Sequence, residues 1–266
     1  MIYWKDFLLP YEQAVEELKI KFKSLRDEYR KRSEFSPIEF VTGRVKAVPS
    51  IIDKAKKMGY SEDHISEMED IAGIRIMCQF EDDIYKVIEL IKNRDGIDLN
   101  IMHEKNYIEN KKESGYRSYH MIIKYPVITV KGLTEVLAEV QIRTLAMNFW
   151  ATIEHSLNYK YRGNIPANIV EKLKKSAEAA YQLDQEMLAI RDEVIDAQEL
   201  FSLKSNTVTR IISYINMLEN IGEKETAIFY RKKLNDTIES FDDNSNQKLL
   251  KNIAEELRVI TERKHA

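Results

Sequence analysis

The sequence predicts an α+β fold in which helices flank a small mixed β-sheet. The first observation is that strand-like runs rich in β-branched residues alternate with helical stretches over residues 37–160. The second is the composition, because 266 residues that are 44% hydrophobic and 32% charged suit one globular domain with an appendage. The third is that no apolar run approaches the length of a membrane span.

The N-terminal part is predicted to hold two helices. The first covers residues 7–32, where apolar residues recur at helical spacing: Val15, Leu18, Phe22, Leu25 and Tyr29. The pattern SPIE at 36–39 is typical of a helix start, with a capping serine, a proline in first position and a glutamate that closes a capping box. This second helix is predicted to continue to Met58, to end at Gly59 and to kink at Pro49.

The sheet is predicted from four strand-like runs, at 72–80, 97–103, 118–125 and 134–143, the last two joined across Pro126 and Gly132. Further helices are predicted at 82–93, at 144–160 and from Pro166 to about Phe201, with a polar loop at 104–117. The chain beyond differs in character and is expected to form three helices, broken at Gly222 and at DDNSN. We therefore predict a main domain over 1–200 and a helical extension over 201–266.

Charge and cysteine content narrow the functional classes. Lys+Arg 41 against Asp+Glu 44 leaves a net charge of −3, so a global basic surface for duplex DNA is not expected. The single cysteine, Cys78, lies in an apolar run, where it is a poor nucleophile and has no internal partner for a disulfide. With acids early in the N-terminus and no signal-peptide pattern, a cytoplasmic protein is expected.

The segment LAEVQIRT (137–144) places an acid, an amide and a guanidinium on one side of a strand. Side chains alternate between faces along a strand, so Glu139, Gln141 and Arg143 share a face. Two interpretations remain open. The face is either the solvated side of a half-exposed strand or the floor of a cleft.

Asp70 comes just before the predicted strand AGIRIMCQF, and Arg75 lies within it. They are either a turn carboxylate and an edge arginine, or parts of a site in which Asp70 and Glu139 share Mg²⁺. Magnesium needs few protein carboxylates, because it keeps waters and takes phosphate oxygens from its substrate.

Two further segments carry cations. Residues 42–54 contain Arg44, Lys46, Ser50 and Lys54, which on a helix form either a solvated basic face or a row aimed at a polyphosphate. Residues 111–120 combine rings and charge around a turn, at Lys111, Lys112, Gly115, Tyr116, Arg117 and His120. Together these favour an anionic ligand with a flat ring. The glycine-rich phosphate motifs GxxxxGK[ST] and GxGxxG are absent, so cationic side chains would have to bind the phosphates.

Four blocks, GRVK, DIAGIRIMCQF, KESGYRSYH and EVQIRTLAMNFWATIEHSLNYKY, closely resemble the synthetase domain of the RelA/SpoT homologue superfamily. The resemblance covers roughly residues 4–200 and is closest to the single-domain small alarmone synthetases of the RelQ type. It implies a nucleotidyltransferase-like fold and a GTP pyrophosphokinase of the stringent response. Such an enzyme transfers the pyrophosphoryl group of ATP to the ribose 3′-hydroxyl of GDP or GTP with Mg²⁺, giving ppGpp or pppGpp and AMP.

The resemblance also implies residue roles. Asp70 and Glu139 would hold Mg²⁺, and Glu139 would be the general base. ATP would bind at Arg44, Lys46, Ser50, Lys54 and Arg75, with its adenine between the two arginines. GDP or GTP would bind at Lys105, Lys112, Tyr116, His120, Gln141 and Asn148, with guanine stacked on Tyr116. The product pppGpp would bind an allosteric pocket between subunits at Lys19, Lys23, Arg26, Glu39, Phe40 and Thr42.

The family further implies a homotetramer and, in some members, single-stranded RNA as a ligand. Two departures stand out: Lys105 replaces a frequent arginine, and residues 202–266 extend beyond the usual end of the small synthetases. No His-Asp dipeptide occurs, so alarmone hydrolysis is not expected. The alternatives are a single-stranded RNA-binding regulator with a vestigial site, and a nucleotidyltransferase that releases pyrophosphate.

Overall fold

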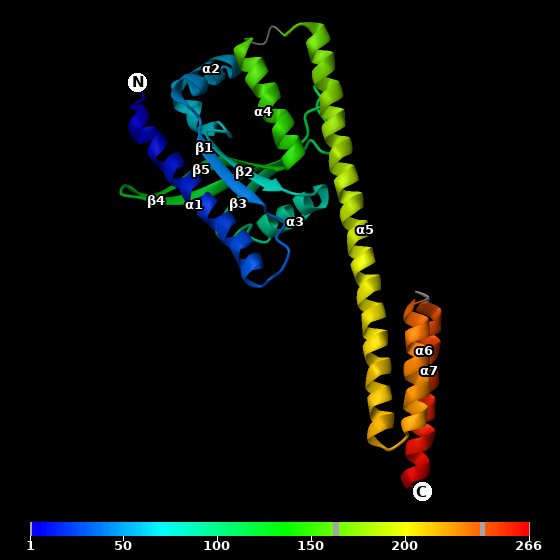
Figure 1. Ribbon diagram of the computed structural model, residues 1–266. Helices are drawn as coiled ribbons and strands as arrows, with labels where there is room; N and C mark the ends of the chain where they lie inside the picture. Colours follow the sequence, from blue (N-terminus) through cyan, green and yellow to red (C-terminus); the bar gives the residue numbers. More distant parts are fainter. Residues whose placement is uncertain (1, 162–164, 240–242, 266) are drawn as a thin grey trace. The chain divides into compact units, whose positions relative to one another are not determined.

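The computed structural model describes residues 2–161, 165–239 and 243–265 (Figure 1). The chain divides into two compact units, Met1–Leu188 and Ala189–Ala266. The first unit holds a β-sheet with its covering helices, and the second is helical. No helix in the described part of the chain is long and apolar enough to cross a bilayer.

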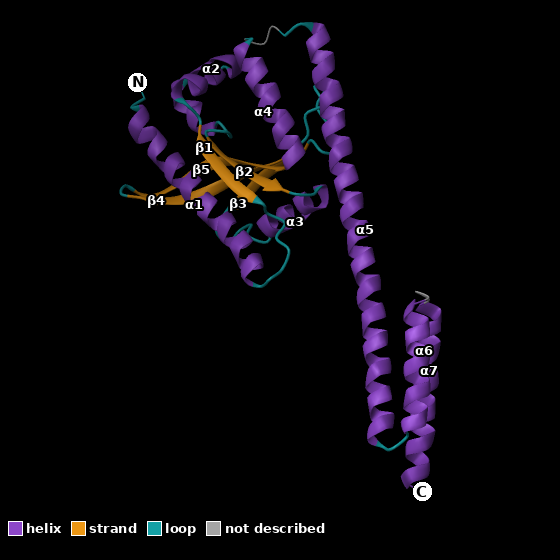
Figure 2. Cartoon of the chain, in the orientation of Figure 1, coloured by secondary structure: helices purple, strands orange, loops and turns teal. Residues whose placement is uncertain are grey.

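A five-stranded mixed sheet forms the centre of the first unit, with the strand order β1-β2-β5-β4-β3 (Figure 2). The strands are β1 (Phe40–Val45), β2 (Ala72–Cys78), β3 (Asn100–Asn106), β4 (Tyr119–Thr129) and β5 (Gly132–Thr144). β2 and β5 are parallel, and the other three neighbouring pairs are antiparallel. The predicted α+β fold with a mixed sheet is therefore confirmed.

One face of the sheet is apolar and carries the core. The helices α1 (Trp4–Lys31) and α3 (Glu81–Lys92) pack against the strands. Buried side chains of these helices and of alternate strand positions form one cluster, which includes Leu18, Phe22, Ile84, Val87, Ile74, Ile76, Val140 and Ile142. Because side chains alternate along a strand, the intervening residues are left for the opposite face.

The prediction of a helix that starts at SPIE is wrong for the first half of that helix. Residues Phe40–Val45 form strand β1, and helix α2 covers only Val48–Met58. The Ser36 hydroxyl accepts a hydrogen bond from the amide of Ile38 (3.2 Å) in a turn rather than capping a helix. Pro49 lies in the first turn of α2, where proline is tolerated, so no kink arises.

Other elements follow the prediction more closely. The helices expected at 82–93 and 144–160 are α3 and α4 (Leu145–Lys160), and the strand expected at 97–103 lies slightly later as β3. Pro126 lies within β4 rather than in the connection to β5. It is tolerated there because β3 pairs with β4 only as far as Lys124, so β4 has one neighbour at Pro126.

The second unit has its own core. Helix α5 (Ala167–Asn220) continues past the predicted end near Phe201 and includes the first of the three predicted C-terminal helices. After a turn at Gly222 (φ +90°), α6 (Lys224–Glu239) and α7 (Asp243–His265) follow. The three helices share the buried residues Ile211, Ile215, Leu218, Ala227, Tyr230, Leu234, Leu249 and Ile253. Of the break predicted at DDNSN, residues 243–246 lie in α7, so the prediction is wrong there, and residue 242 lies outside the described residues.

Candidate active site

Two rows of opposed residues cross all five strands on the face away from the apolar core. Residues directly opposite each other on neighbouring strands project to the same side of a sheet. The strand register gives the first row as Thr42, Arg75, Gln141, His120 and Lys105. The second row is Arg44, Gly73, Glu139, Ile122 and His103. The sheet therefore gathers charged and polar groups that lie far apart in the sequence.

A cavity of about 620 Å³ lies over these rows. Its walls come from the sheet, from the segments just after β1 and just before β2, from the loop before β4 and from α4. The lining residues are Thr42, Gly43, Arg44, Lys46, Asp70, Gly73, Ile74, Arg75, Lys112, Tyr116, His120, Glu139, Gln141, Arg143, Ala151, Thr152 and His155. A cavity of this size suits a cofactor-sized or nucleotide-sized ligand.

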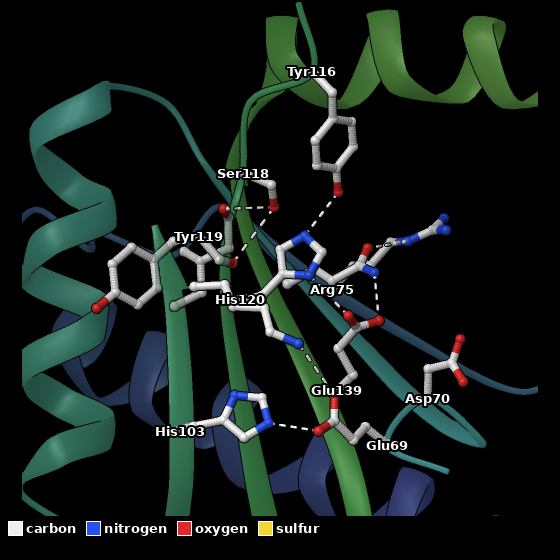
Figure 3. Close-up of polar contacts among 12 residues, drawn as sticks. Glu69, Asp70, Arg75, His103, Tyr116, Ser118, Tyr119, His120 and Glu139 are labelled. Atoms are coloured by element: carbon white, nitrogen blue, oxygen red, sulfur yellow. Dashed lines mark hydrogen bonds and ion pairs between the residues drawn. The ribbon is translucent and has the colours of Figure 1, made fainter. Parts of the chain in front are cut away.

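Two neighbouring side chains orient Glu139, one of the two acids that line the cavity (Figure 3). One carboxylate oxygen lies 2.8 Å from Nδ1 of His120, and the other accepts a hydrogen bond of 2.7 Å from Nε2 of Gln141. Burial raises the pKa of Glu139, but the contacts with His120 and Gln141 outweigh burial and lower the pKa overall. The carboxylate is therefore ionised at neutral pH and is oriented by its neighbours, as a general base should be.

Asp70 is the second acid of the cavity. Its Oδ2 atom binds Nζ of Lys46 (2.6 Å) and of Lys54 (2.8 Å), and its Oδ1 atom is buried without a hydrogen-bond partner. Burial raises the pKa of Asp70, but the contacts with the two lysines outweigh burial and hold the pKa below its usual value. The carboxylate lies close enough to Glu139 to raise the pKa of that residue by charge repulsion.

This pair of acids fits a hard divalent cation. Two carboxylates face one cavity (Figure 3), and the buried, unpartnered Oδ1 of Asp70 is free to bind a ligand. The described residues contain no group of three or more histidine, cysteine or acidic side chains placed to hold a metal ion. A metal at Asp70 and Glu139 would thus take its other oxygens from water and from a phosphorylated ligand, as Mg²⁺ commonly does.

Three arginines add positive charge to the cavity beside Lys46 and Lys112. Arg44, Arg75 and Arg143 all line it. Burial lowers the pKa of Arg75, and repulsion from Arg143 and Arg44 lowers it further. Guanidinium groups held together despite this repulsion favour a ligand with several negative charges.

Tyr116 provides a flat ring at the same cavity. Its hydroxyl oxygen lies 2.8 Å from Nε2 of His120 and accepts a 2.5 Å hydrogen bond from Nη2 of Arg143. The same Arg143 nitrogen donates to Oε1 of Gln141 (2.7 Å). The Lys112 ammonium lies 4.9 Å from the ring centroid, so a ring that stacks on that side would displace it. A continuous hydrogen-bond network thus joins Tyr116 to Glu139.

Most of the predicted substrate residues meet at this cavity, and four lie outside its lining: Ser50, Lys54, Lys105 and Asn148. Lys54 contacts Asp70, which lines the cavity, whereas Ser50 is exposed in the first turn of α2. Lys105 closes the first row but is paired with Glu69 (3.4 Å). Asn148 lies on α4, one turn before Thr152, with a buried and unpartnered Oδ1 atom.

Two cations near Tyr116 point elsewhere. Lys111 and Arg117, which the sequence suggested as phosphate ligands, both contact Glu178 of α5 (3.3 and 3.4 Å). The Arg117 guanidinium also stacks on the Tyr181 ring at 3.8 Å. They fasten the loop to α5 rather than line the cavity.

The predicted allosteric residues lie on α1 and at the start of β1. Lys19, Lys23 and Arg26 are on α1, and Nη1 of Arg26 donates to the backbone carbonyl of Glu39 (3.5 Å). Lys19 binds Glu16 (2.8 Å) on its own helix. Phe40 is exposed, and Thr42 also lines the large cavity.

Among the polar side chains of the cavity wall, Arg143, Thr152 and His155 received no role from the sequence alone. Arg143 was placed on the correct face of its strand but not in the site. Thr152 and His155 of α4 were missed altogether. Ala151 and His155 lie one helical turn apart on the face of α4 toward the sheet. This spacing is the signal that could have identified His155, and Thr152 follows Ala151 directly.

Comparisons with known proteins agree with this geometry. Residues 43–164 match the model of the region found in RelA / SpoT proteins. The chain is similar to GTP pyrophosphokinase YjbM of Bacillus subtilis, with 56% identity over 201 residues, 76% of this chain and 94% of that protein. It is also similar to the crystal structure of small alarmone synthetase 1 from Bacillus subtilis bound to its product pppGpp (TM-score 0.69, 55% identity, 72% of this chain and 97% of that one). The same synthetase bound to AMPCPP gives a TM-score of 0.65 at 52% identity, over 73% of this chain and 98% of that one.

Proposed function

Because the chain belongs to the RelA/SpoT family as a small alarmone synthetase, a GTP pyrophosphokinase, we propose that its cavity binds ATP beside GDP or GTP and transfers the pyrophosphoryl group between them. The observation that carries this proposal is the convergence on one sheet face of two acids, three arginines and a tyrosine ring. The products are AMP and ppGpp or pppGpp, made in the cytoplasm in the stringent response.

The donor and the acceptor take opposite ends of the strand rows. ATP lies toward β1, with adenine between Arg44 and Arg75 and its phosphates near Lys46, Ser50 and Lys54. The acceptor lies toward β4 and β3, with guanine on Tyr116 and its phosphates and ribose near Lys105, Lys112, His120, Gln141 and Asn148. The order of the strands supports this division, since β1 and β3 are the two edges of the sheet.

The protein's own part in the reaction is positioning and proton transfer. The ribose 3′-hydroxyl gives its proton to the carboxylate of Glu139, which His120 and Gln141 hold in place. The 3′-oxygen forms a bond to the β-phosphorus of ATP, the bond from that phosphorus to the α-phosphate oxygen breaks, and AMP leaves. The arginines and lysines stabilise the negative charge of the transferred group. Mg²⁺, held by Asp70 and Glu139, would neutralise phosphate charge when bound.

Regulation and assembly are proposed from the family resemblance together with the placement of α1. The product binds near Lys19, Lys23, Arg26, Glu39, Phe40 and Thr42 and activates a homotetramer, and single-stranded RNA competes with it. The contact of Arg26 with the Glu39 carbonyl supports a common surface from α1 and β1.

Product identification tests the proposed reaction. Purified protein with Mg²⁺, labelled ATP and either GDP or GTP should release AMP and form ppGpp or pppGpp, resolved by thin-layer chromatography. Glu139→Ala should give no product while still binding nucleotides. Release of pyrophosphate instead of AMP would identify a nucleotidyltransferase, and unchanged ATP with both acceptors would rule out the proposed activity.

A further inference from the structure

Glu69 makes an ion-pair contact with the far edge of the sheet. It lies beside Asp70, just before β2, and one carboxylate oxygen is 2.5 Å from Nε2 of His103 while the other is 3.4 Å from Nζ of Lys105 (Figure 3). His103 and Lys105 belong to β3, and β5 and β4 lie between β2 and β3 in the sheet. The acid therefore connects two segments that the sheet keeps apart.

Lys105 lies at the β3 end of the first polar row. It is directly opposite His120 on β4, so its ammonium is on the cavity side of the sheet. His120 in turn contacts Glu139 (2.8 Å). Lys105 is thus the cation that follows His120 toward the edge strand, and Glu69 partly neutralises it.

We propose that Glu69 is a specificity-determining residue whose carboxylate competes with the 5′-phosphates of the acceptor nucleotide for Lys105. This inference rests on the proposed function, which places the acceptor at this end of the rows. With Glu69 in place, the carboxylate offsets part of the charge of Lys105, so Lys105 contributes less to acceptor binding than an unpaired lysine would. Without the carboxylate, Lys105 is free to bind phosphate, most strongly the longer and more highly charged chain of GTP.

The two contacts of Glu69 differ in a way that suits competition. The lysine contact is long at 3.4 Å, and the side chains of Lys105 and Glu69 are 46% and 39% exposed. Exposed pairs of this kind contribute roughly 0.2–1 kcal/mol, so a phosphate can displace the carboxylate. The shorter contact with His103 anchors Glu69, so that the carboxylate stays near Lys105 rather than turning into solvent.

Glu69→Gln tests the inference, because glutamine keeps the shape of the side chain and removes its charge. The KM for GTP should fall by about two- to five-fold, the range expected for an exposed ion pair, and the KM for GDP should fall less. The KM for ATP should not change. The fall should disappear in the double variant Glu69→Gln, Lys105→Ala, because Lys105 is the group that is released.

Glu67→Gln is the matched control. Glu67 lies two residues earlier in the chain, at the end of the short 3-10 helix Glu62–Glu67, and binds His64 (2.7 Å) rather than Lys105. It undergoes the same loss of charge, so its KM for GTP should stay as in the wild type. An equal fall in both variants would mean that net charge is responsible and would overturn the inference.

Glu69→Asp tests the inference if Glu69→Gln does not fold, because the shorter side chain withdraws the carboxylate from Lys105 and keeps its charge. The KM for GTP should also fall in this variant, by no more than in Glu69→Gln. Lys105→Ala should raise the KM for GTP more in the Glu69→Asp background than in the wild type, and an equal effect in both backgrounds would overturn the inference. An unchanged or raised KM for GTP in a folded Glu69→Gln protein would also overturn the inference. If wild type forms no pppGpp, the proposed function itself fails, which is a separate result.

Discussion

At the residue scale, the hydroxyl of Tyr116 links the ring of the site to Glu139, the proposed general base. It contacts His120 and Arg143, and those two residues contact Glu139 and Gln141 in turn. Arg143 is only 4% exposed. The ring is therefore held at a fixed angle by a network that also holds the base, so substitutions at Tyr116 should separate stacking from hydrogen bonding.

Two variants of Tyr116 separate these roles. Tyr116→Ala removes the stacking surface and should raise the KM for GDP or GTP by about ten-fold or more, with a smaller change for ATP. Tyr116→Phe keeps the ring but loses both hydroxyl contacts, so its KM for the acceptor should stay near that of wild type while kcat falls. Steady-state kinetics with each substrate varied measures this. Equal losses for ATP and acceptor in Tyr116→Ala would contradict the placement of guanine.

The buried carboxyl group of Asp184 should make the free energy of unfolding depend on pH. Asp184 is buried and is not among the residues that line the cavity. Its Oδ2 atom accepts a 2.6 Å hydrogen bond from the Thr144 hydroxyl. Burial raises the pKa of Asp184 to about 6. The folded protein thus binds this proton more tightly than the unfolded chain, and stability from this group falls as pH rises from about 4 to 6.

Asp184→Asn removes that titration and keeps an acceptor for Thr144. The free energy of unfolding of the variant, minus that of wild type, should rise by about 2 kcal/mol between pH 4.5 and 7. Urea unfolding followed by tryptophan fluorescence measures it, because Trp4 and Trp150 both lie in the first unit. A difference that does not vary with pH would show that Asp184 ionises normally.

At the element scale, the sequence predicts local elements well and long-range pairing poorly. The apolar periodicity of α1 and the alternation of β5 are local signals, and both are present in the structure. Residues 40–45 follow a capping pattern, but their pairing with β2, with Val41 opposite Ile76, makes them a strand. Glycine at position 43 allows this close packing, since a Cβ there would lie 2.9 Å from side-chain atoms of Ile74 and Val15.

The same limit applies to the site. Alternation along β5 placed Glu139, Gln141 and Arg143 on one face without knowledge of any partner strand. The pairing of Glu69 with β3 and the turn of Arg117 toward α5 depend on which segments fold next to each other. No periodicity within one element encodes those contacts, so the sequence pattern could not predict them.

The close packing of the loop before β4 against α5 predicts that a side chain at Gly115 disturbs acceptor binding. Gly115 has φ +89°, and a Cβ at this position would lie 2.6 Å from Cβ of Ala177. Gly115→Ala should displace Tyr116 and raise the KM for the acceptor, with little change for ATP. Gly132→Ala is the control for backbone strain alone, because Gly132 has φ +102° with nothing within 4 Å of the added Cβ.

Ala177→Gly should partly restore acceptor binding in the Gly115→Ala protein, because it removes the atom that clashes. Acceptor kinetics of the single and double variants measure this. If Gly132→Ala impairs acceptor binding as much as Gly115→Ala, the contact with α5 is not what positions the loop.

At the scale of the whole molecule, each of the two units has a core of its own among the described residues. The residues of the sheet core lie between Tyr11 and Met147, and those of the helical core between Ile211 and Ile253. All residues that line the large cavity belong to the first unit. The chemistry therefore should not need the second unit, whatever that unit contributes to assembly or regulation.

Two truncations test this independence. A chain ending at residue 200 should synthesise pppGpp at close to the wild-type kcat. A chain ending at residue 222 should aggregate, because Ile211, Ile215 and Leu218 would lose the cover of α6 and α7. Kinetics and light scattering measure the two effects. Loss of basal synthesis in a soluble chain of residues 1–200 would show that the extension takes part in catalysis.

The central claim is that Asp70 and Glu139 meet at one divalent cation between the two nucleotides. A crystal structure of the protein with Mg²⁺, a non-hydrolysable ATP analogue and GDP tests it most directly. We predict a metal ion bound to both carboxylates, adenine between Arg44 and Arg75, and guanine against Tyr116. A metal bound away from either acid, or nucleotides bound outside the cavity, would contradict the account.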